Sequence, residues 1–192
     1  MRANDSASGM ARARAPRVSV FGSGGGGEAD LARARRLGVA LARAGYAVLN
    51  GGYGGTMEAA AIGAEEAGGR AIGVTCAEFT FRSGPNPHLA EVIEAPTLFA
   101  RIERLVRDGD AYVALPGGNG TLAEIAMAWE CLRKGLISPR PLVAWSDPWR
   151  QVFGELAEGA YVDVGIDLFT WVDGVDEAVE AIRGRVPANA RS

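Results

Sequence analysis

The chain has little of what common catalytic and metal-binding chemistries require. Its 192 residues include two cysteines, Cys76 and Cys131, a single histidine, His88, and a single lysine, Lys134. The cysteines show no Cys-x-x-Cys spacing and His88 has no second histidine, so the sequence predicts no metal site. Pyridoxal phosphate chemistry needs a lysine that forms a Schiff base. Lys134 is predicted at the end of a helix, about 20 Å from its glycine-rich start, which argues against that chemistry.

The sequence also lacks a basic excess and a long apolar run. The formal net charge is -3 and the isoelectric point is near 5.3, whereas nucleic-acid-binding proteins carry basic patches. No apolar run approaches the roughly 20 residues of a membrane-spanning helix. We therefore expect a cytoplasmic protein that binds neither nucleic acid nor membrane. Both cysteines are expected to be reduced there, although a disulfide between them is compatible with the spacing.

Length and composition predict one folded domain with loose ends. A chain of this size with 48% hydrophobic residues can bury about 70% of the surface of its unfolded state. Residues 1–16 mix arginine, alanine, serine and proline without an apolar segment, which predicts a disordered tail. Residues 186–192 are predicted to form a second loose end. The single domain is accordingly expected at residues 17–185.

The domain alternates short apolar strands with amphipathic helices. Gly45 is placed to cap the first helix, and the segment between the third strand and the third helix is predicted as a loop rich in proline and glycine. The predicted strands are 17–21, 46–50, 70–75, 111–115 and 141–145, and the predicted helices are 29–44, 56–67, 97–108, 121–134 and 149–158. This order predicts a Rossmann-like, doubly wound α/β fold, with helices on both faces of a parallel sheet and ligands bound beyond the carboxyl ends of the strands.

The most informative segment is the glycine-rich loop before the fourth predicted helix. Gly117, Gly118 and Gly120 allow the backbone to approach a ligand closely, and the helix start that follows can bind an anion. No Gly-Lys-Ser/Thr follows the glycines, so a monophosphate is a simpler ligand than a triphosphate. Alternatively, Thr121 and Glu124 form a capping box that serves only the helix. Three glycines exceed what a helix start needs, which favours ligand binding.

Two further glycine-rich turns follow strands at the same predicted edge of the sheet. Residues 22–27 match the Gly-x-Gly-x-x-Gly pattern of dinucleotide-binding folds, but Asn50 stands where such folds place an acidic residue for the ribose. A full NAD site is therefore not predicted. Residues 51–56, Gly-Gly-Tyr-Gly-Gly-Thr, have the same outline as residues 117–121. Two such turns on one edge indicate a nucleotide crevice; the alternative is glycine required only for tight packing.

Two charged residues flank the predicted crevice. Arg101 lies at the edge of the apolar stripe of helix 97–108, and Glu124 borders the apolar stripe of helix 121–134. An arginine at such a boundary is often an ordinary solvated side chain, and Glu124 has the capping box as its alternative role. Their positions beside the glycine-rich turns make them candidates for function.

Residues 116–124, Pro-Gly-Gly-Asn-Gly-Thr-Leu-Ala-Glu, resemble the Pro-Gly-Gly-x-Gly-Thr-x-x-Glu signature of the LONELY GUY family, phosphoribohydrolases that release a cytokinin base from its riboside monophosphate. The resemblance spans roughly residues 18–145, and Arg101 matches the active-site arginine of that family. It implies that Arg101 and Glu124 are catalytic and that residues 117–121 bind the 5′-phosphate. The nucleotide-binding residues that it implies are Gly22, Ser23, Gly52, Gly54, Met57, Leu98, Gly117, Gly118, Asn119, Gly120 and Thr121.

The resemblance leaves more than one activity open. Met57 and Glu58 look closer to a bacterial branch that also resembles molybdenum cofactor carrier proteins, which bind without hydrolysis. Our leading hypothesis is a homo-oligomeric hydrolase of nucleoside 5′-monophosphates that uses no cofactor. The alternatives are a non-catalytic carrier with the molybdenum cofactor as its ligand, and a nucleotide-sensing module whose assembly changes on binding.

Overall fold

The computed structural model describes residues 14–80, 84–158 and 165–186. The predicted N-terminal tail lies outside these ranges apart from residues 14–16, and the predicted C-terminal tail lies outside them apart from Val186. Val186 is 9% exposed, and its carbonyl oxygen accepts a hydrogen bond of 2.6 Å from the Tyr46 hydroxyl. The last described residue is therefore packed against the domain.

The fold is built on one seven-stranded sheet in which every pair of neighbouring strands is parallel. The strand order is β4-β3-β2-β1-β5-β6-β7. The strands are β1 (Arg17–Phe21), β2 (Ala47–Asn50), β3 (Ala71–Cys76), β4 (Glu91–Ala95), β5 (Ala111–Ala114), β6 (Leu142–Trp145) and β7 (Phe169–Val172). The predicted doubly wound α/β fold is confirmed.

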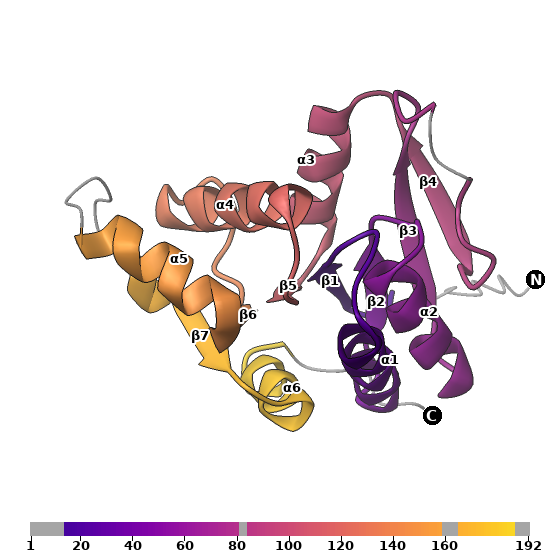
Figure 1. Ribbon diagram of the computed structural model, residues 1–192, viewed down its shortest axis with the longest axis horizontal. Helices are drawn as coiled ribbons and strands as arrows, with labels where there is room; N and C mark the ends of the chain where they lie inside the picture. The colour runs from indigo at the N-terminus through magenta and orange to yellow at the C-terminus, as the bar shows by residue number, and fades with distance from the viewer. Residues whose placement is uncertain (1–13, 81–83, 159–164, 187–192) are drawn as a thin grey trace, which may run out of the picture.

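Within the described ranges, six α-helices cover the sheet in two layers, three on each face (Figure 1). One layer contains α1 (Glu28–Arg43), α2 (Thr56–Glu66) and α6 (Val175–Arg183). The other contains α3 (Leu98–Asp108), α4 (Asn119–Arg133) and α5 (Ser146–Glu158), and a short 3-10 helix, Ile166–Leu168, precedes β7. Among the described residues, no helix combines the length and apolar character needed to cross a bilayer.

Each face of the sheet has its own hydrophobic core because successive side chains of a strand point to opposite faces. In β5, Val113 packs with the α1, α2 and α6 layer, whereas Tyr112 packs with the α3, α4 and α5 layer. All four residues of β5 are buried. This explains why the central strands have nearly continuous apolar sequences, as expected for a parallel sheet covered on both sides.

Helices α1 and α2 approach each other closely through two glycines. A Cβ at Gly38 would overlap the carbonyl oxygen of Ala60, and a Cβ at Gly63 would overlap the carbonyl oxygen of Arg35. The two helices follow the glycine-rich turns after β1 and β2. Their contact therefore fixes the relative position of those two turns.

The sequence predictions missed the elements at the two edges of the sheet. β4 lies within the predicted proline- and glycine-rich loop, and β7 and α6 follow the last predicted helix. β4 has the sequence Glu-Val-Ile-Glu-Ala, and its Val92 is 47% exposed. The two glutamates interrupt the continuous apolar run that identified the central strands.

The expected cap at Gly45 is confirmed: its φ is 88°, and its N–H donates to the Ala42 carbonyl oxygen at 3.0 Å. Cys76 and Cys131 are not joined by a disulfide.

Candidate active site

The candidate site lies at the topological switch point of the sheet, between β1 and β5, where the strand order reverses. These neighbouring strands are followed by helices on opposite faces, α1 and α4, and ligands of doubly wound folds bind in the crevice at such a point. A cleft of about 410 Å³ is present there, within the size range of small-molecule sites. The predicted site residues that line it are Gly22, Ser23, Met57, Leu98, Arg101, Gly118, Asn119, Gly120, Thr121 and Glu124.

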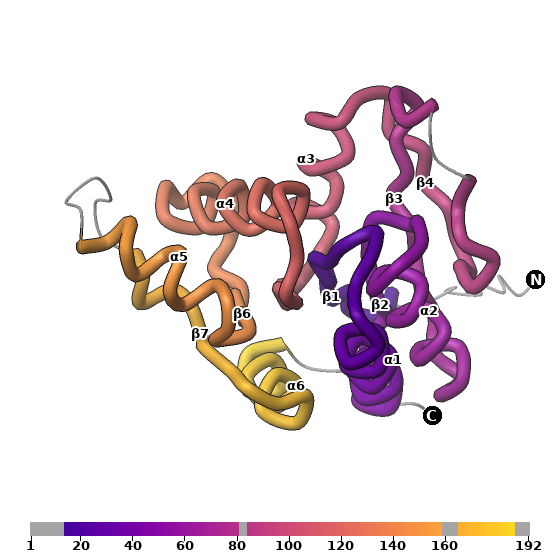
Figure 2. The backbone as a smooth tube through the Cα atoms, in the orientation of Figure 1, coloured from indigo at the N-terminus to yellow at the C-terminus, as the bar shows by residue number. Residues whose placement is uncertain are grey.

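Arg101 and Glu124 form a buried ion pair between α3 and α4, which lie side by side (Figure 2). Arg101 Nη1 donates to Glu124 Oε1 at 3.0 Å, and Arg101 Nε donates to the Val74 carbonyl oxygen of β3 at 2.8 Å. Each of the two side chains is 7% exposed. The arginine thereby connects three elements and holds the carboxylate at the wall of the cleft.

The Glu124 carboxyl has an unusual pKa because it is removed from water. Burial raises its pKa to about 7, although the charge of Arg101 and its hydrogen bond act in the opposite direction. A carboxyl with a pKa near neutrality can gain and lose a proton at physiological pH. Glu124 is also the only buried carboxylate among the described residues.

Among the described residues, no side chain caps the start of α4. Its N-cap, Gly118, makes no side-chain hydrogen bond, and the first turn contains no acidic residue. Thr121 Oγ1 is buried and has no hydrogen-bond partner in the described part of the chain, and Glu124 is engaged with Arg101. The alternative interpretation, a capping box between Thr121 and Glu124, is therefore wrong. Free N–H groups, a helix dipole and a buried hydroxyl together form a site suited to an anion.

Three of the predicted binding glycines are not part of the cleft lining. A Cβ at Gly52 would lie 3.1 to 3.4 Å from β3 and its side chain at Thr75, and a Cβ at Gly117 would overlap the Thr121 hydroxyl. Gly54 has room for a Cβ, with Glu58 3.7 Å away. Gly52 and Gly117 thus serve the close packing that was the alternative to ligand binding.

Backbone contact between the first two glycine-rich turns explains further glycines. Gly55 has a φ of 70°, and a Cβ there would meet the backbone of Gly25 at 2.6 Å. Thr56 Oγ1 accepts a hydrogen bond of 2.8 Å from Ser23 N. Asn50, which replaces the acidic ribose ligand of NAD-binding folds, accepts a hydrogen bond of 2.8 Å from Gly52 N. Its role in this structure is to hold the second turn.

Sequence reasoning missed an aromatic wall of the cleft. Tyr53 and Phe79 line it, together with Gly24, Ile102 and Ala123. Both rings have centroids 5.9 Å from the guanidinium carbon of Arg101. Tyr53 lies within the second glycine-rich turn but was not among the predicted site residues. Phe79 belongs to the loop after β3, where nothing in the sequence pattern marks it.

A larger hollow, of about 830 Å³, lies between α1 and α6 on the other face. Its charged side chains partly neutralise one another, as in the ion pairs Arg35–Glu66 and Arg183–Glu180. It contains neither the buried carboxylate nor the glycine-rich turns. Within the described residues, no group of three or more histidine, cysteine, aspartate or glutamate side chains is arranged to hold a metal ion. The smaller cleft is therefore the candidate active site.

Comparison with known proteins finds relatives of two kinds. The model of the SLOG cluster4 family matches residues 15–143. A cytokinin riboside 5′-monophosphate phosphoribohydrolase of Mycobacterium tuberculosis is 30% identical over 156 residues, covering 77% of this chain and 82% of that protein. The structure of the molybdenum cofactor binding protein of Rippkaea orientalis has a TM-score of 0.73 and 26% identity, covering 90% of this chain and 98% of that chain. The molybdenum cofactor carrier protein of Chlamydomonas reinhardtii has a TM-score of 0.70 and 27% identity, covering 89% and 98%.

Proposed function

Because the chain belongs to the LOG-type SLOG cluster4 family, we propose that it binds a nucleoside 5′-monophosphate and hydrolyses its N-glycosidic bond. One observation carries the proposal: the buried Arg101–Glu124 pair lies beside the uncapped start of α4. Glu124 is three residues beyond Thr121, about 5 Å along the helix. A nucleotide held by its phosphate at the helix start places its ribose near the carboxylate.

The phosphate is bound by the glycine-rich start of α4. The N–H groups of Asn119, Gly120 and Thr121 precede the first intrahelical bond, from Leu122 N to the Gly118 carbonyl oxygen. The helix dipole favours negative charge there. The buried, unpartnered Thr121 hydroxyl gains an acceptor when a phosphate oxygen is present.

The reaction breaks the bond between the sugar C1′ and the base nitrogen. Positive charge develops on the sugar as the base leaves, and the Glu124 carboxylate stabilises that charge. A water molecule attacks C1′ and transfers a proton to Glu124. The departing base nitrogen takes up one proton from solvent and Glu124 releases its proton to solvent, so that free base and ribose 5-phosphate result and the carboxylate is regenerated. Arg101 positions the carboxylate through the 3.0 Å hydrogen bond from Nη1.

The activity is tested by incubating the purified protein with AMP and with cytokinin riboside 5′-monophosphates. Chromatography should detect free base and ribose 5-phosphate in equal amounts. A protein that releases no base from any of these nucleotides is not such a hydrolase. Nucleosides without phosphate serve as the control, because they lack the anion that the start of α4 is proposed to bind.

The pH dependence follows from the raised pKa of Glu124. The ionised carboxylate is the active form, and its pKa is about 7 in the folded protein. Activity is therefore retained above pH 7 and lost as the pH falls through it. We expect kcat/KM to fall about tenfold for each pH unit below 7. A profile that stays flat to pH 5 contradicts this role of Glu124.

The second ionisation of the AMP phosphate also lies near pH 6. Its effect on binding therefore has to be measured separately from the ionisation of Glu124. The affinity of AMP for the Glu124→Gln variant, measured over the same pH range, reports the phosphate without the carboxylate. Any part of the profile that this variant reproduces belongs to binding and not to Glu124.

Replacing Gly51 with alanine should displace Arg101. A Cβ at Gly51 would overlap Arg101 Nη2, and the arginine cannot move away without loss of its hydrogen bond to Val74 or Glu124. We expect kcat/KM to fall about 100-fold, the effect of a displacement of about 1 Å in a reactive geometry. The matched control is Gly184→Ala, because Gly184 lies at the end of α6 with room for a Cβ. Full activity of Gly51→Ala would contradict the proposed position of the arginine.

A non-catalytic carrier is the second candidate, supported by the similarity to the two molybdenum cofactor proteins. The same free helix start can bind the phosphate group of such a ligand. A carrier should copurify with the molybdenum cofactor, and its binding should survive Glu124→Gln.

A nucleotide sensor should instead bind AMP without turnover and change its assembly state. Homo-oligomerisation remains part of our proposal and is tested by the light-scattering mass in solution.

A further inference from the structure

Besides the glycine-rich start of α4, the cleft lining has an apolar aromatic side. Tyr53 follows β2 and Phe79 follows β3, and their ring centroids are 5.8 Å apart with planes inclined by 43°. Phe79 is partly exposed and lines the cleft with Met57 and Leu98. The proposed phosphate site and this aromatic side therefore bind chemically different parts of a ligand.

The loop that carries Phe79 is fixed at several points. The Tyr53 hydroxyl accepts a hydrogen bond of 2.8 Å from Cys76 N, and Phe79 N donates to the Cys76 carbonyl oxygen at 3.1 Å. Glu78 Oε2 accepts a hydrogen bond of 2.8 Å from Leu98 N at the start of α3. Phe79 is accordingly held in a set position at the cleft wall before any ligand binds.

Arg101 restricts what can occupy the space beside these rings. Its guanidinium carbon is 5.9 Å from the centroids of both Tyr53 and Phe79, and its charge is already paired with Glu124. The positive guanidinium group repels a second cation beside the rings. A flat, neutral, polarisable ring can instead stack on an aromatic side chain. Nucleotide bases have this character.

We propose that Phe79, supported by Tyr53, is the stacking surface for the base and determines specificity for ligands that carry a planar aromatic base. The inference rests on the proposed function, because the phosphate must bind at the start of α4 for the base to reach Phe79. It adds a specificity-determining residue that neither the glycine motifs nor the catalytic pair contains. Stacking on an aromatic side chain commonly changes affinity by about ten- to a hundredfold per base.

The test compares AMP with ribose 5-phosphate, which has the same sugar and phosphate but no base. Calorimetry is carried out in the Glu124→Gln background, so that AMP is not consumed. Phe79→Leu should weaken AMP binding at least about tenfold and change ribose 5-phosphate binding less than twofold. Phe79→Trp, which keeps an aromatic surface, should retain AMP affinity.

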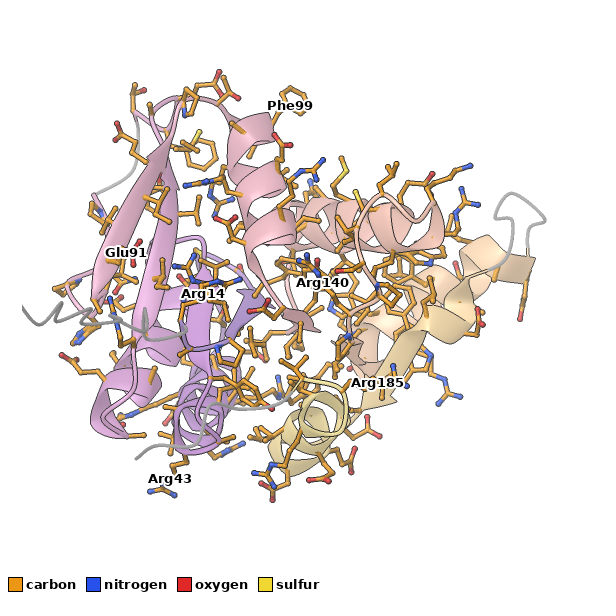
Figure 3. The ribbon with its side chains drawn as sticks, turned by 180° about the vertical axis from the view of Figure 1, so that it is seen from behind. Arg14, Arg43, Glu91, Phe99, Arg140 and Arg185 are labelled. Atoms are coloured by element: carbon orange, nitrogen blue, oxygen red, sulfur yellow. The ribbon has the colours of Figure 1, made fainter. Side chains whose placement is uncertain are left out.

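Phe99→Leu is the matched control. Phe99 is 81% exposed and projects from α3 away from the body of the protein (Figure 3), so its replacement should leave both affinities unchanged. Thermal unfolding of each variant checks that Phe79→Leu is folded.

The outcomes separate this inference from the proposed hydrolysis. Equal losses for the two ligands mean that Phe79 acts on Arg101 or on the fold and overturn the inference. Unchanged AMP affinity, or no AMP binding with Phe79 intact, overturns it as well. Conversely, a selective loss for AMP in the Glu124→Gln background, together with a wild-type protein that releases no base, supports the inference and overturns hydrolysis.

Discussion

The Glu124→Gln variant is expected to hydrolyse AMP with a kcat lowered by about 10³-fold, while its affinity for AMP changes only a few-fold. A general base or charge-stabilising carboxylate commonly contributes 10² to 10⁴ in rate, roughly. The effect appears in kcat because the carboxylate acts on charge that develops only in the transition state. The measurement is initial-rate kinetics of base release, with calorimetry for AMP affinity.

The same substitution should change stability little, since two effects oppose each other. The glutamine amide oxygen can still accept the hydrogen bond from Arg101, but the arginine loses its counter-charge. Against this, burial raises the pKa of Glu124 to about 7 in the folded protein. The protonated carboxyl therefore adds to the free energy of unfolding below the pKa of the unfolded state, and this contribution is lost as the pH rises through 7. Glutamine has no such loss, so the two proteins should unfold within a few degrees of each other at pH 8.

Glu130→Gln provides the control on the same helix. Glu130 is exposed and forms a 2.8 Å ion pair with Arg133, away from the cleft. Its replacement should leave kcat and KM unchanged. If Glu124→Gln turns over AMP as fast as Glu130→Gln does, the carboxylate has no part in the reaction.

The second large effect is on stability: Gly38→Ala should lower the free energy of unfolding by about 3 kcal/mol. A Cβ at this position would overlap the Ala60 carbonyl oxygen and lie 3.0 Å from Ala64 N. These are backbone atoms of α2, so the clash is relieved only if the two helices move apart. We expect the midpoint of thermal unfolding to fall by about 6 to 12 °C.

Gly154→Ala is the matched substitution in another helix. Gly154 lies in α5, where a Cβ meets no atom within 4 Å, so alanine should raise the stability by about 0.5 to 1 kcal/mol. Denaturant unfolding of both variants measures the difference. Similar stabilities would show that the close contact of α1 and α2 is not a constraint.

The relation between sequence and fold differs between the centre and the edges of the sheet. Strands such as β5 are apolar at every position, and this identified them because both faces are covered. β4 has a partner strand on one side only, and its exposed Val92 and Glu94 leave a mixed sequence in a segment with several prolines. Which segment adds to a sheet edge is decided by the neighbouring strand, in this case β3, and not by local composition.

The site divides in a similar way. Arg101 and Glu124 were found from their spacing to the glycine-rich loop and from the family signature. Their 3.0 Å contact joins residues on two helices, which a one-dimensional pattern does not contain. It also decided between the two interpretations of Glu124: a carboxylate bonded to Arg101 is not the partner of Thr121 in a capping box.

Taken alone, the sequence determined the alternation of strands and helices, the glycine-rich turns at one edge of the sheet and the two candidate catalytic residues. These features are local, because apolar periodicity and short motifs specify how a segment folds. Tertiary structure alone decided that Glu124 is buried against Arg101 with a pKa of about 7, that Gly51 leaves space for the arginine, and that Phe79 faces the cleft. Desolvation, steric overlap and pairing of charge depend on which distant segments meet in space, and only the folded chain brings them together.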